Sequence, residues 1–226
     1  MDFEELLARR RSTRKYQDRP LTPRQIGSVI ASASRAPVGS NLYKDVHITV
    51  VRDQKLLHRL CEAAWKRFST KEKVKEIAGD TADGENLLKP NLFYGAPAVF
   101  FVSHRRQDVQ PGIEWANVTT ITCMMHLEAV NLGLGSVFMW GALESMRLFP
   151  ELDHTRELEL PEGFVPLIAL AVGYPCEAPG PAKKQHVIAV NYIPLRRDDD
   201  KWSCGAGIFA GALPPGAACS SGASTF

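Results

Sequence analysis

Apolar residues are spaced along most of the chain in two alternating patterns, one typical of helices and one typical of strands. Helical spacing of three and four residues marks four segments: one that starts at Asp2, then 22–36, 53–68 and 113–132. Runs of β-branched and other apolar residues mark four predicted strands: 46–51, 98–102, 136–140 and 165–172. The alternation of helices and strands favours a single α/β or α+β domain.

Several of the predicted helices carry start signals. Asp2, with an acidic residue three positions later, has the pattern of a capping box. Thr22 with Pro23 and Gln25 is the stronger signal, because it joins an N-cap residue, a first-turn proline and a capping-box glutamine. Asp53 is placed to cap the next helix in the chain. We therefore expect helices to begin at these three positions.

The segment 113–132 is the longest predicted helix, and 12 of its 20 residues are apolar. These residues lie on nearly all sides, so we expect the helix to be covered both by its own core and by a second subunit. Its larger side chains and its histidine are expected to be core or dimer contacts: Trp115, Met124, Met125 and His126. The continuous apolar run 165–172 predicts a strand in the middle of a sheet.

The composition is that of a folded globular protein without an excess of either charge. The 226 residues are 45% hydrophobic and 23% charged, with a formal net charge of +2, which gives no support for a nucleic-acid partner. Apolar runs are interrupted well before the length of a membrane span. The first residues lack the apolar run of a secretory signal, so we expect a cytoplasmic protein.

Familiar catalytic and metal-binding motifs do not occur in the sequence. The five cysteines form no C-x-x-C pair and the six histidines no H-E-x-x-H, so we expect no metal site. Hydrolase and P-loop motifs are also missing. Cys123 and Cys176 are expected to be inert buried thiols, because no resolving cysteine is near either of them. No side chain is assigned a catalytic role, which favours chemistry carried by a bound cofactor.

The densest charge lies between residues 9 and 19, where six of the eleven residues are basic. Cations at the C-terminal end of the first helix would complement its dipole. Guanidinium groups beside a serine hydroxyl would equally suit a phosphate monoester. A nucleic-acid-binding arm is a third interpretation, although no further basic stripe accompanies it. On composition alone the three interpretations stay open.

Five short motifs, in the same order and at sensible spacing, resemble those of the nitroreductase family of flavoproteins. The opening R-R-S-x-R-x-[FY] is matched between Arg10 and Tyr16. The A-P-S-x-x-N loop, the a-P-x-x-[IV] strand, the G-L-G-s segment and the closing L-G-Y-P…P-x-K stretch are matched in turn at 36–41, 95–99, 133–136 with 140–141, and 171–175 with 181–184. Each motif is weak alone, but together they span about residues 3–195.

The resemblance implies an α+β fold with a central mixed, mainly antiparallel sheet flanked by helices, and FMN sites at the interface of a homodimer. The FMN-binding residues that match the family's positions are Arg10, Arg11, Ser12, Arg14, Asn41, Trp140, Gly141, Lys183 and, less directly, Lys184. The first four would contact the phosphate, the ribityl chain and the pyrimidine edge, and the late lysine the phosphate. Asn41 would contact the flavin ring, and the backbone around Trp140 and Gly141 would face flavin N5, where a donor stabilises developing charge.

The reaction implied by the resemblance needs no catalytic side chain. NADH or NADPH would pass hydride to flavin N5 and leave, and a nitroaromatic, quinone or similar small molecule would then be reduced in the same pocket. Relatives resembling iodotyrosine deiodinase, or the flavin-fragmenting enzyme of cobalamin ligand synthesis, perform other reactions at this site. Such divergent flavin chemistry, and a non-catalytic flavin-binding protein, are the alternatives.

The chain departs from the family pattern at three places. Val38 replaces a serine, residues 43–45 replace Q-P-W, and Gln185 replaces a late arginine; these changes bear on substrate choice and FMN affinity. The charged, glycine-punctuated segment 69–91 predicts a mobile helical excursion or lid. We expect a nitroreductase-like FMN-binding domain over 1–202 and a disordered Gly/Ala/Ser/Pro-rich tail over 203–226.

Overall fold

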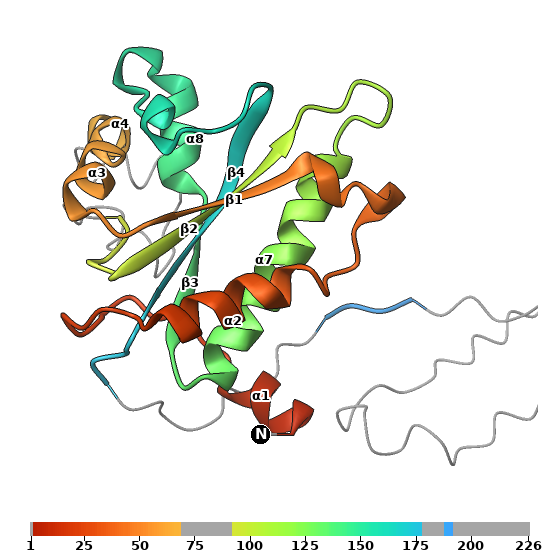
Figure 1. The fold of residues 1–226 in the computed structure, drawn as a ribbon, viewed down its shortest axis with the longest axis vertical. Coiled ribbons are helices and arrows are strands. Elements are labelled where there is room, and N and C mark those ends of the chain that lie inside the picture. Colours follow the sequence, from red (N-terminus) through yellow and green to blue (C-terminus); the bar gives the residue numbers. More distant parts are fainter. Residues whose placement is uncertain (1, 69–91, 178–187, 192–226) are drawn as a thin grey trace, which may run out of the picture. The chain divides into compact units, whose positions relative to one another are not determined.

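The computed structural model describes residues 2–68, 92–177 and 188–191 (Figure 1). The chain divides into two units after Lys184, and every helix and strand below belongs to the first unit. Residues 188–191, in the second unit, form no helix or strand. The predicted lid at 69–91, the tail at 203–226, the domain boundary after residue 202 and the position of Gln185 lie outside the described residues.

Four strands form an antiparallel sheet in the order β1-β2-β4-β3 (Figure 1). Their bounds are β1 Val46–Val51, β2 Ala98–Arg105, β3 Gly135–Met139 and β4 Phe164–Gly173. The predicted strand at 165–172 therefore lies inside the sheet, between two hydrogen-bonded neighbours, as its continuous apolar run indicated. An isolated parallel bridge between Ser12 and Ser136 adds a short piece of mixed pairing at the β3 edge.

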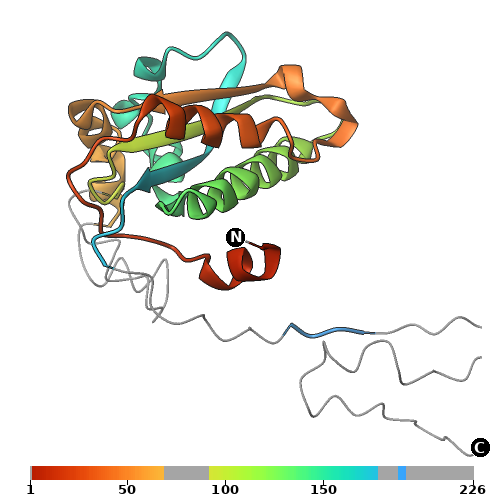
Figure 2. The same cartoon turned by 60° about the horizontal axis from the view of Figure 1, so that its bottom comes forward.

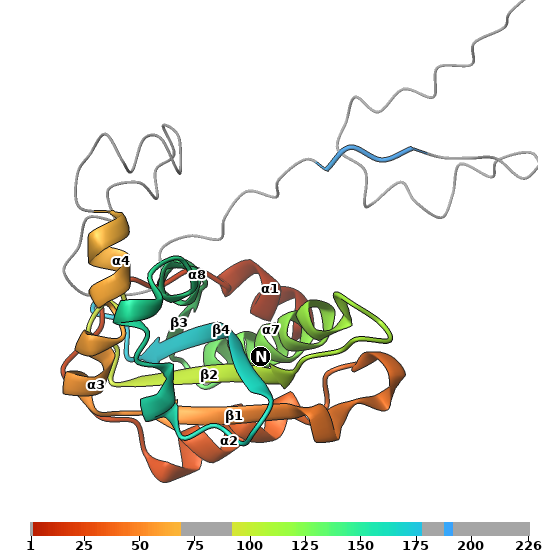
Figure 3. The ribbon, with the colours of Figure 1, turned by 90° about the horizontal axis from the view of Figure 1, so that it is seen from above.

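Helices cover both faces of this sheet, which confirms the expected α+β class. On one face lie α2 (Pro23–Ala33) and α7 (Ile113–Asn131), which contact each other and share a core with Phe100 and Leu170. The other face carries α3 (Gln54–Arg59), α4 (Glu62–Arg67) and α8 (Gly141–Leu148), grouped together in Figure 3. Successive strand residues alternate between these two cores because side chains of a strand point to opposite faces.

The remaining elements are short. Helix α1 (Phe3–Arg9) has no buried residue and lies beside α7 (Figure 2). Single 3₁₀ turns occur at four places: η1 Gly39–Asn41, η2 Tyr43–Asp45, η3 Pro150–Leu152 and η4 Thr155–Leu158. Within the described ranges, no helix combines the length and the apolar character that crossing a membrane requires.

The cap signals in the sequence are used as expected. The Asp2 side chain accepts a hydrogen bond from the Glu5 backbone at 2.8 Å and starts α1. Thr22 and Gln25 form a reciprocal capping box at the start of α2. Asp53 accepts from the Lys55 backbone at the start of α3. Local side-chain chemistry therefore determines where these helices begin.

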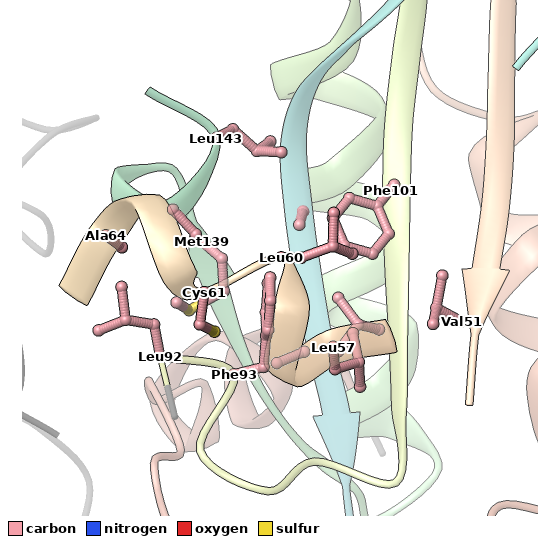
Figure 4. Packing of buried hydrophobic residues seen from close by; sticks show 14 of the residues in the cluster. Val51, Leu57, Leu60, Cys61, Ala64, Leu92, Phe93, Phe101, Met139 and Leu143 are labelled. Atoms are coloured by element: carbon pink, nitrogen blue, oxygen red, sulfur yellow. The ribbon is translucent and has the colours of Figure 1, made fainter. Parts of the chain in front are cut away.

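The predicted single helix over 53–68 is instead two short helices, α3 and α4. The backbone tightens at the junction, where Cys61 N–H donates to the His58 carbonyl at 3.0 Å. Leu57, Leu60 and Ala64 are all buried in the same core, from both sides of the turn (Figure 4). The break lets both short helices pack onto one curved core surface. A single straight helix of this length would lose contact with that surface at one of its ends.

Helix α7 is covered on its sheet side but carries an exposed stripe formed by Ala116, Thr119 and Cys123. The prediction that Cys123 and Cys176 are buried is wrong, since both thiols are exposed. Cysteine is a small apolar side chain that is usually buried, so its residue type alone favoured the core at both positions, Cys123 on α7 and Cys176 after β4.

Candidate functional site

The basic segment that follows α1 lies across the ends of β3 and β4. Ser12 bridges to Ser136, and Thr13 N–H donates to the Ser136 carbonyl at 3.0 Å. Further along, Gln17 N–H donates to the Tyr174 carbonyl at 2.9 Å. These main-chain bonds hold residues 12–17 against the sheet, so the arginines before and within the segment have defined positions.

Two glycines permit this close approach. Gly135 and Gly173 are paired with each other across β3 and β4. A Cβ at residue 135 would lie 2.7 Å from Thr13 Cβ, and one at residue 173 would lie 2.7 Å from Tyr16 Cδ1. A larger residue at position 135 would push the basic segment away from the strand end, and one at position 173 would clash with both Pro97 and Tyr16.

Tyr16 also holds this segment in place, through its hydroxyl. Its hydroxyl lies 2.7 Å from the Thr13 carbonyl and 3.3 Å from the Ala171 carbonyl, and can donate to either. Burial, followed by the nearby Tyr94, raises the pKa of Tyr16 well above its usual value. The phenol therefore stays protonated and remains a hydrogen-bond donor at all ordinary pH values.

Surface partners can be named for three of the clustered bases. Arg9 pairs with Glu5 at 2.6 Å within α1, and Lys15 pairs with Glu177 at 3.0 Å. The Arg19 guanidinium lies 4.0 Å from the centre of the Tyr174 ring. Exposed contacts of this kind contribute little stability, but they direct these three cations away from the β3 edge. The interpretation of these bases as cations at the end of the first helix therefore fits Arg9.

Arg10, Arg11 and Arg14 are the arginines of the motif, and they are neighbours in sequence of the exposed Ser12, which pairs with the start of β3. All three are partly buried. Guanidinium forks and a hydroxyl gathered on one short segment form a donor set suited to a phosphate monoester. The structure brings these four predicted site residues together.

Arg10 has a partner that the sequence did not indicate. Its Nη1 lies 3.3 Å from Nε2 of His126 on α7, and Nδ1 of the same ring is hydrogen-bonded to Ser136 Oγ. Burial, with the Arg10 charge second, lowers the pKa of His126 from 6.5 to about 4. His126 was expected to be a core or dimer contact; it is buried, but it bonds to a site arginine 116 residues away.

An apolar surface continues from this basic end along β3. Phe138 and Trp140 are exposed, and with Trp115 and Ile168 they line a cavity of about 290 Å³. We call these four residues the β3 shelf. The Phe138 ring packs edge-on against His126 at 5.6 Å between centroids. The cavity is near the lower end of small-molecule sites, about 300 Å³, and one of its lining residues, Phe138, also contacts the His126 partner of Arg10.

Trp140 and Gly141 mark the far end of the β3 shelf, where the strand becomes a helix. Trp140 is the N-cap of α8, and Gly141 is its first residue. The first N–H groups of a helix have no partner within the helix. They lie four residues beyond Ser136, a distance of about 13 Å along an extended strand. Backbone donors therefore lie at one end of the shelf and cationic side chains at the other.

Asn41 is not brought to this group within one chain. It lies in η1, where Ser40 and Asn41 both have left-handed backbone angles, φ 54° and 56°. Gly39 N–H donates to Asn117 Oδ1 at 2.8 Å, and this bond fastens the turn to α7. Asn117 and His126 are nine residues apart, two and a half helical turns, which places them on opposite sides of α7 and about 14 Å apart along it. The Asn41 turn and the Arg10 group therefore occupy opposite faces of the same helix.

The turn that carries Asn41 depends on a buried polar chain that sequence reasoning missed. Asn117 Nδ2 donates to His104 Nε2 at 3.2 Å, and His104 Nδ1 lies 2.6 Å from the Arg105 carbonyl. Nε2 of His104 therefore accepts and Nδ1 donates, so the ring carries its proton on Nδ1. In the sequence, the signal for Asn117 and His104 is only that both are polar. Their burial is known from the structure. Lys183 and Lys184, the predicted late phosphate contacts, lie outside the described residues.

The chain folds as an α+β protein in which an arginine-rich segment and an apolar shelf adjoin one edge strand, an arrangement that would suit a flat ring system carrying a phosphate. FMN has this form, and the donor set and the β3 shelf fit its two ends. The sequence matches the model of the nitroreductase family over residues 7–174. The chain belongs to the nitroreductase family.

Individual relatives agree with this assignment. A protein of Methanothermobacter thermautotrophicus, named as an NADH dehydrogenase/NAD(P)H nitroreductase, is 26% identical over 182 residues, 80% of this chain and 81% of that protein. The structure resembles a nitroreductase with bound FMN from Desulfitobacterium hafniense, with a TM-score of 0.69 and 16% identity over 84% of this chain and 97% of that one. An FMN-bound nitroreductase from Bacteroides fragilis matches with a TM-score of 0.63 and 22% identity, over 87% and 100% of the two chains.

Proposed function

We propose that this chain is an FMN-dependent oxidoreductase that takes electrons from NADH or NADPH and delivers them to a small acceptor such as a nitroaromatic or quinone. The broad class follows from family membership and from the names and bound FMN of its relatives. One observation of this chain carries the proposal: the segment with the three arginines lies against the start of edge strand β3, the β3 shelf lies toward its end, and Phe138 of the shelf contacts His126, the partner of Arg10.

Each end of the site has a role that its chemistry supports. Arg10, Arg11 and Arg14, with the Ser12 hydroxyl, would hold the phosphate through charge-assisted hydrogen bonds. FMN, when bound, would supply the two-electron chemistry. The β3 shelf would exclude water from one side of the ring, and the backbone N–H groups at Trp140 and Gly141 would stabilise negative charge near N5. Lys183 or Lys184 would add a further cation at the phosphate.

We also propose that the active protein is a homodimer, because Asn41 and Arg10, both expected to contact FMN, lie at opposite faces of α7 within one chain. An exposed stripe on α7 is formed by Ala116, Thr119 and Cys123. It lies between the face that contacts the Asn41 turn and the face that contacts Arg10. Two α7 helices packed antiparallel along this stripe would bring the Asn41 turn of one subunit to the Arg10 end of the other. A two-fold axis is the simplest closed arrangement that does so. The cytoplasmic location expected from the sequence stays a prediction.

The proposal is tested by the absorbance of the purified protein, followed by anaerobic mixing with NADH and then with NADPH. We expect flavin bands that bleach with at least one nucleotide and return when a quinone or nitroaromatic is added. Bands that persist with both nucleotides would favour a non-catalytic flavin-binding protein. A colourless protein that cannot be reconstituted with FMN would contradict both functions.

A matched pair of variants tests the phosphate end. Arg14→Ala should weaken FMN binding by roughly 10- to 150-fold, since a charge-assisted hydrogen bond contributes about 1.5–3 kcal/mol and 1.4 kcal/mol is a decade. Arg9→Ala is the control, because Arg9 belongs to the same basic run but pairs with Glu5. Titration of the apoprotein with FMN measures both, and equal affinities for the two variants would refute the assignment of Arg14.

A further inference from the structure

Arg10 is joined to the edge strand of the sheet through the ring of His126. An arginine side chain has hydrogen-bond donors but no acceptor, so Nε2 of His126 must accept from Arg10 Nη1 across the 3.3 Å contact. The ring proton is then on Nδ1, which donates to Ser136 Oγ. Two fixed partners therefore select one tautomer of this ring.

The ring is also held neutral. His126 is 2% exposed, and burial together with the Arg10 charge lowers its pKa to about 4. At neutral pH the Nε2 lone pair is therefore available to Arg10. A protonated ring would instead present a second cation to the guanidinium and would lose this bond.

The backbone of Arg10 is held by its own helix, where its N–H donates to the Leu6 carbonyl at 3.1 Å, but its guanidinium makes the bond to His126 on another helix. Arg10 is the C-cap of α1, a seven-residue helix with no buried side chain. An arginine has several rotatable bonds, and ordering such a side chain has an entropic cost. The contact with His126 connects Arg10 to α7 and, through Ser136, to the strand whose next exposed residue is Phe138 of the shelf.

We propose that His126 is a positioning residue that holds the Arg10 guanidinium at the phosphate end of the site by linking it to Ser136. This inference rests on the proposed FMN function. His126 itself does not touch the phosphate; it acts by giving Arg10 one orientation before the ligand arrives, which reduces the cost of binding.

Two substitutions separate the two bonds of the ring. In His126→Asn the terminal amide stands near the place of Nδ1, so the Ser136 bond can persist while the Arg10 bond is lost. In His126→Gln the amide reaches the place of Nε2, and its oxygen can accept from Arg10. FMN and riboflavin are the probes, because riboflavin has the same ring but no phosphate. Flavin fluorescence titration of each apoprotein gives the dissociation constants.

We expect His126→Asn to weaken FMN binding about 2- to 12-fold, which corresponds to reordering one long side chain. His126→Gln should stay within about twofold of the wild type, and riboflavin binding should be alike in all three proteins. In an Arg10→Ala background, His126→Asn should have no further effect, because a positioning residue acts only through its partner. The wild-type ring should give ¹⁵N chemical shifts of the Nδ1-protonated tautomer.

Four results would overturn the inference. They are an unchanged FMN affinity in His126→Asn, an equal loss for riboflavin, a loss that persists without Arg10, and an Nε2-protonated ring in the wild type. The last measurement needs no variant, so it decides the question even if His126→Asn does not fold. A wild-type protein that binds neither FMN nor riboflavin would instead refute the proposed function, and this inference with it.

Discussion

Acid should destabilise this protein through His126 at a pH where most carboxylates are still ionised. The pKa of His126 is 6.5 in an unfolded chain and about 4 in the folded protein, because the ring is buried beside Arg10. Between these two values the unfolded chain binds more protons, so stability is lost as the pH falls through this window. Each pKa unit corresponds to 1.36 kcal/mol, so the full loss is about 3 kcal/mol. From about pH 7.5 to about pH 5 the expected loss is about 2 kcal/mol.

The assay is urea unfolding at these two pH values, with equal slopes taken as evidence that the same surface is exposed. His126→Gln removes the titrating ring, so its stability should fall by about 2 kcal/mol less than that of the wild type over this interval. His154→Gln is the control: His154 contacts Glu62 on the surface, and its removal leaves the His126 effect in place. Carboxylates such as Glu157, whose pKa is lowered by Arg59, lose their contribution only below this interval. If the wild type and His126→Gln lose the same stability, the ring is not buried in its neutral form.

Three other predictions concern the frame of the site. Gly135→Ala should displace the basic segment through contact with Thr13 and weaken FMN binding. Gly27→Ala, with open space at its Cβ, should instead raise the free energy of unfolding by about 0.4–1 kcal/mol. Equal melting temperatures for the two variants would contradict this. Phe100→Ala should cost about 3–5 kcal/mol in urea unfolding, because Phe100 is fully buried; a cost below 1 kcal/mol would mean that the core is wrongly described. Light scattering should give twice the 25.0 kDa of one chain, and Thr119→Arg on the exposed stripe of α7 should shift it toward the monomer; a wild-type monomer with FMN bound would refute the dimer.

Much of the secondary structure could be predicted from local sequence. β1 has the predicted bounds, and the caps at Asp2 and Thr22 form the expected hydrogen bonds. These features depend on residues within four positions of one another, so their physics is present in the sequence itself. The break between α3 and α4 was missed, because apolar spacing continues through it and the bend is set by the shape of the core beneath.

The basic cluster shows where local information ends. Its composition left helix-end, phosphate and nucleic-acid interpretations open, and the three could be separated only by the partners of each cation. Arg9 and Lys15 pair with nearby acids, while Arg10 turns toward α7. Side chains on one short segment differ in role because they face different neighbours, and the neighbours of Arg10 and Lys15 are more than 100 residues away in sequence.

The sequence by itself therefore determined the four strands and the starts of three helices, the family resemblance and the residue types of the site, but neither the break between α3 and α4 nor helix α8. Tertiary structure alone decided that Arg10 meets His126 and Ser136, that Phe138 joins the basic end to the shelf, and that Asn41 faces away from both. The physical reason lies in helix α7. Residues nine positions apart on it belong to one continuous helical pattern in the sequence, but they point in opposite directions. Periodicity along a chain records which residues are apolar, whereas packing decides which of them meet.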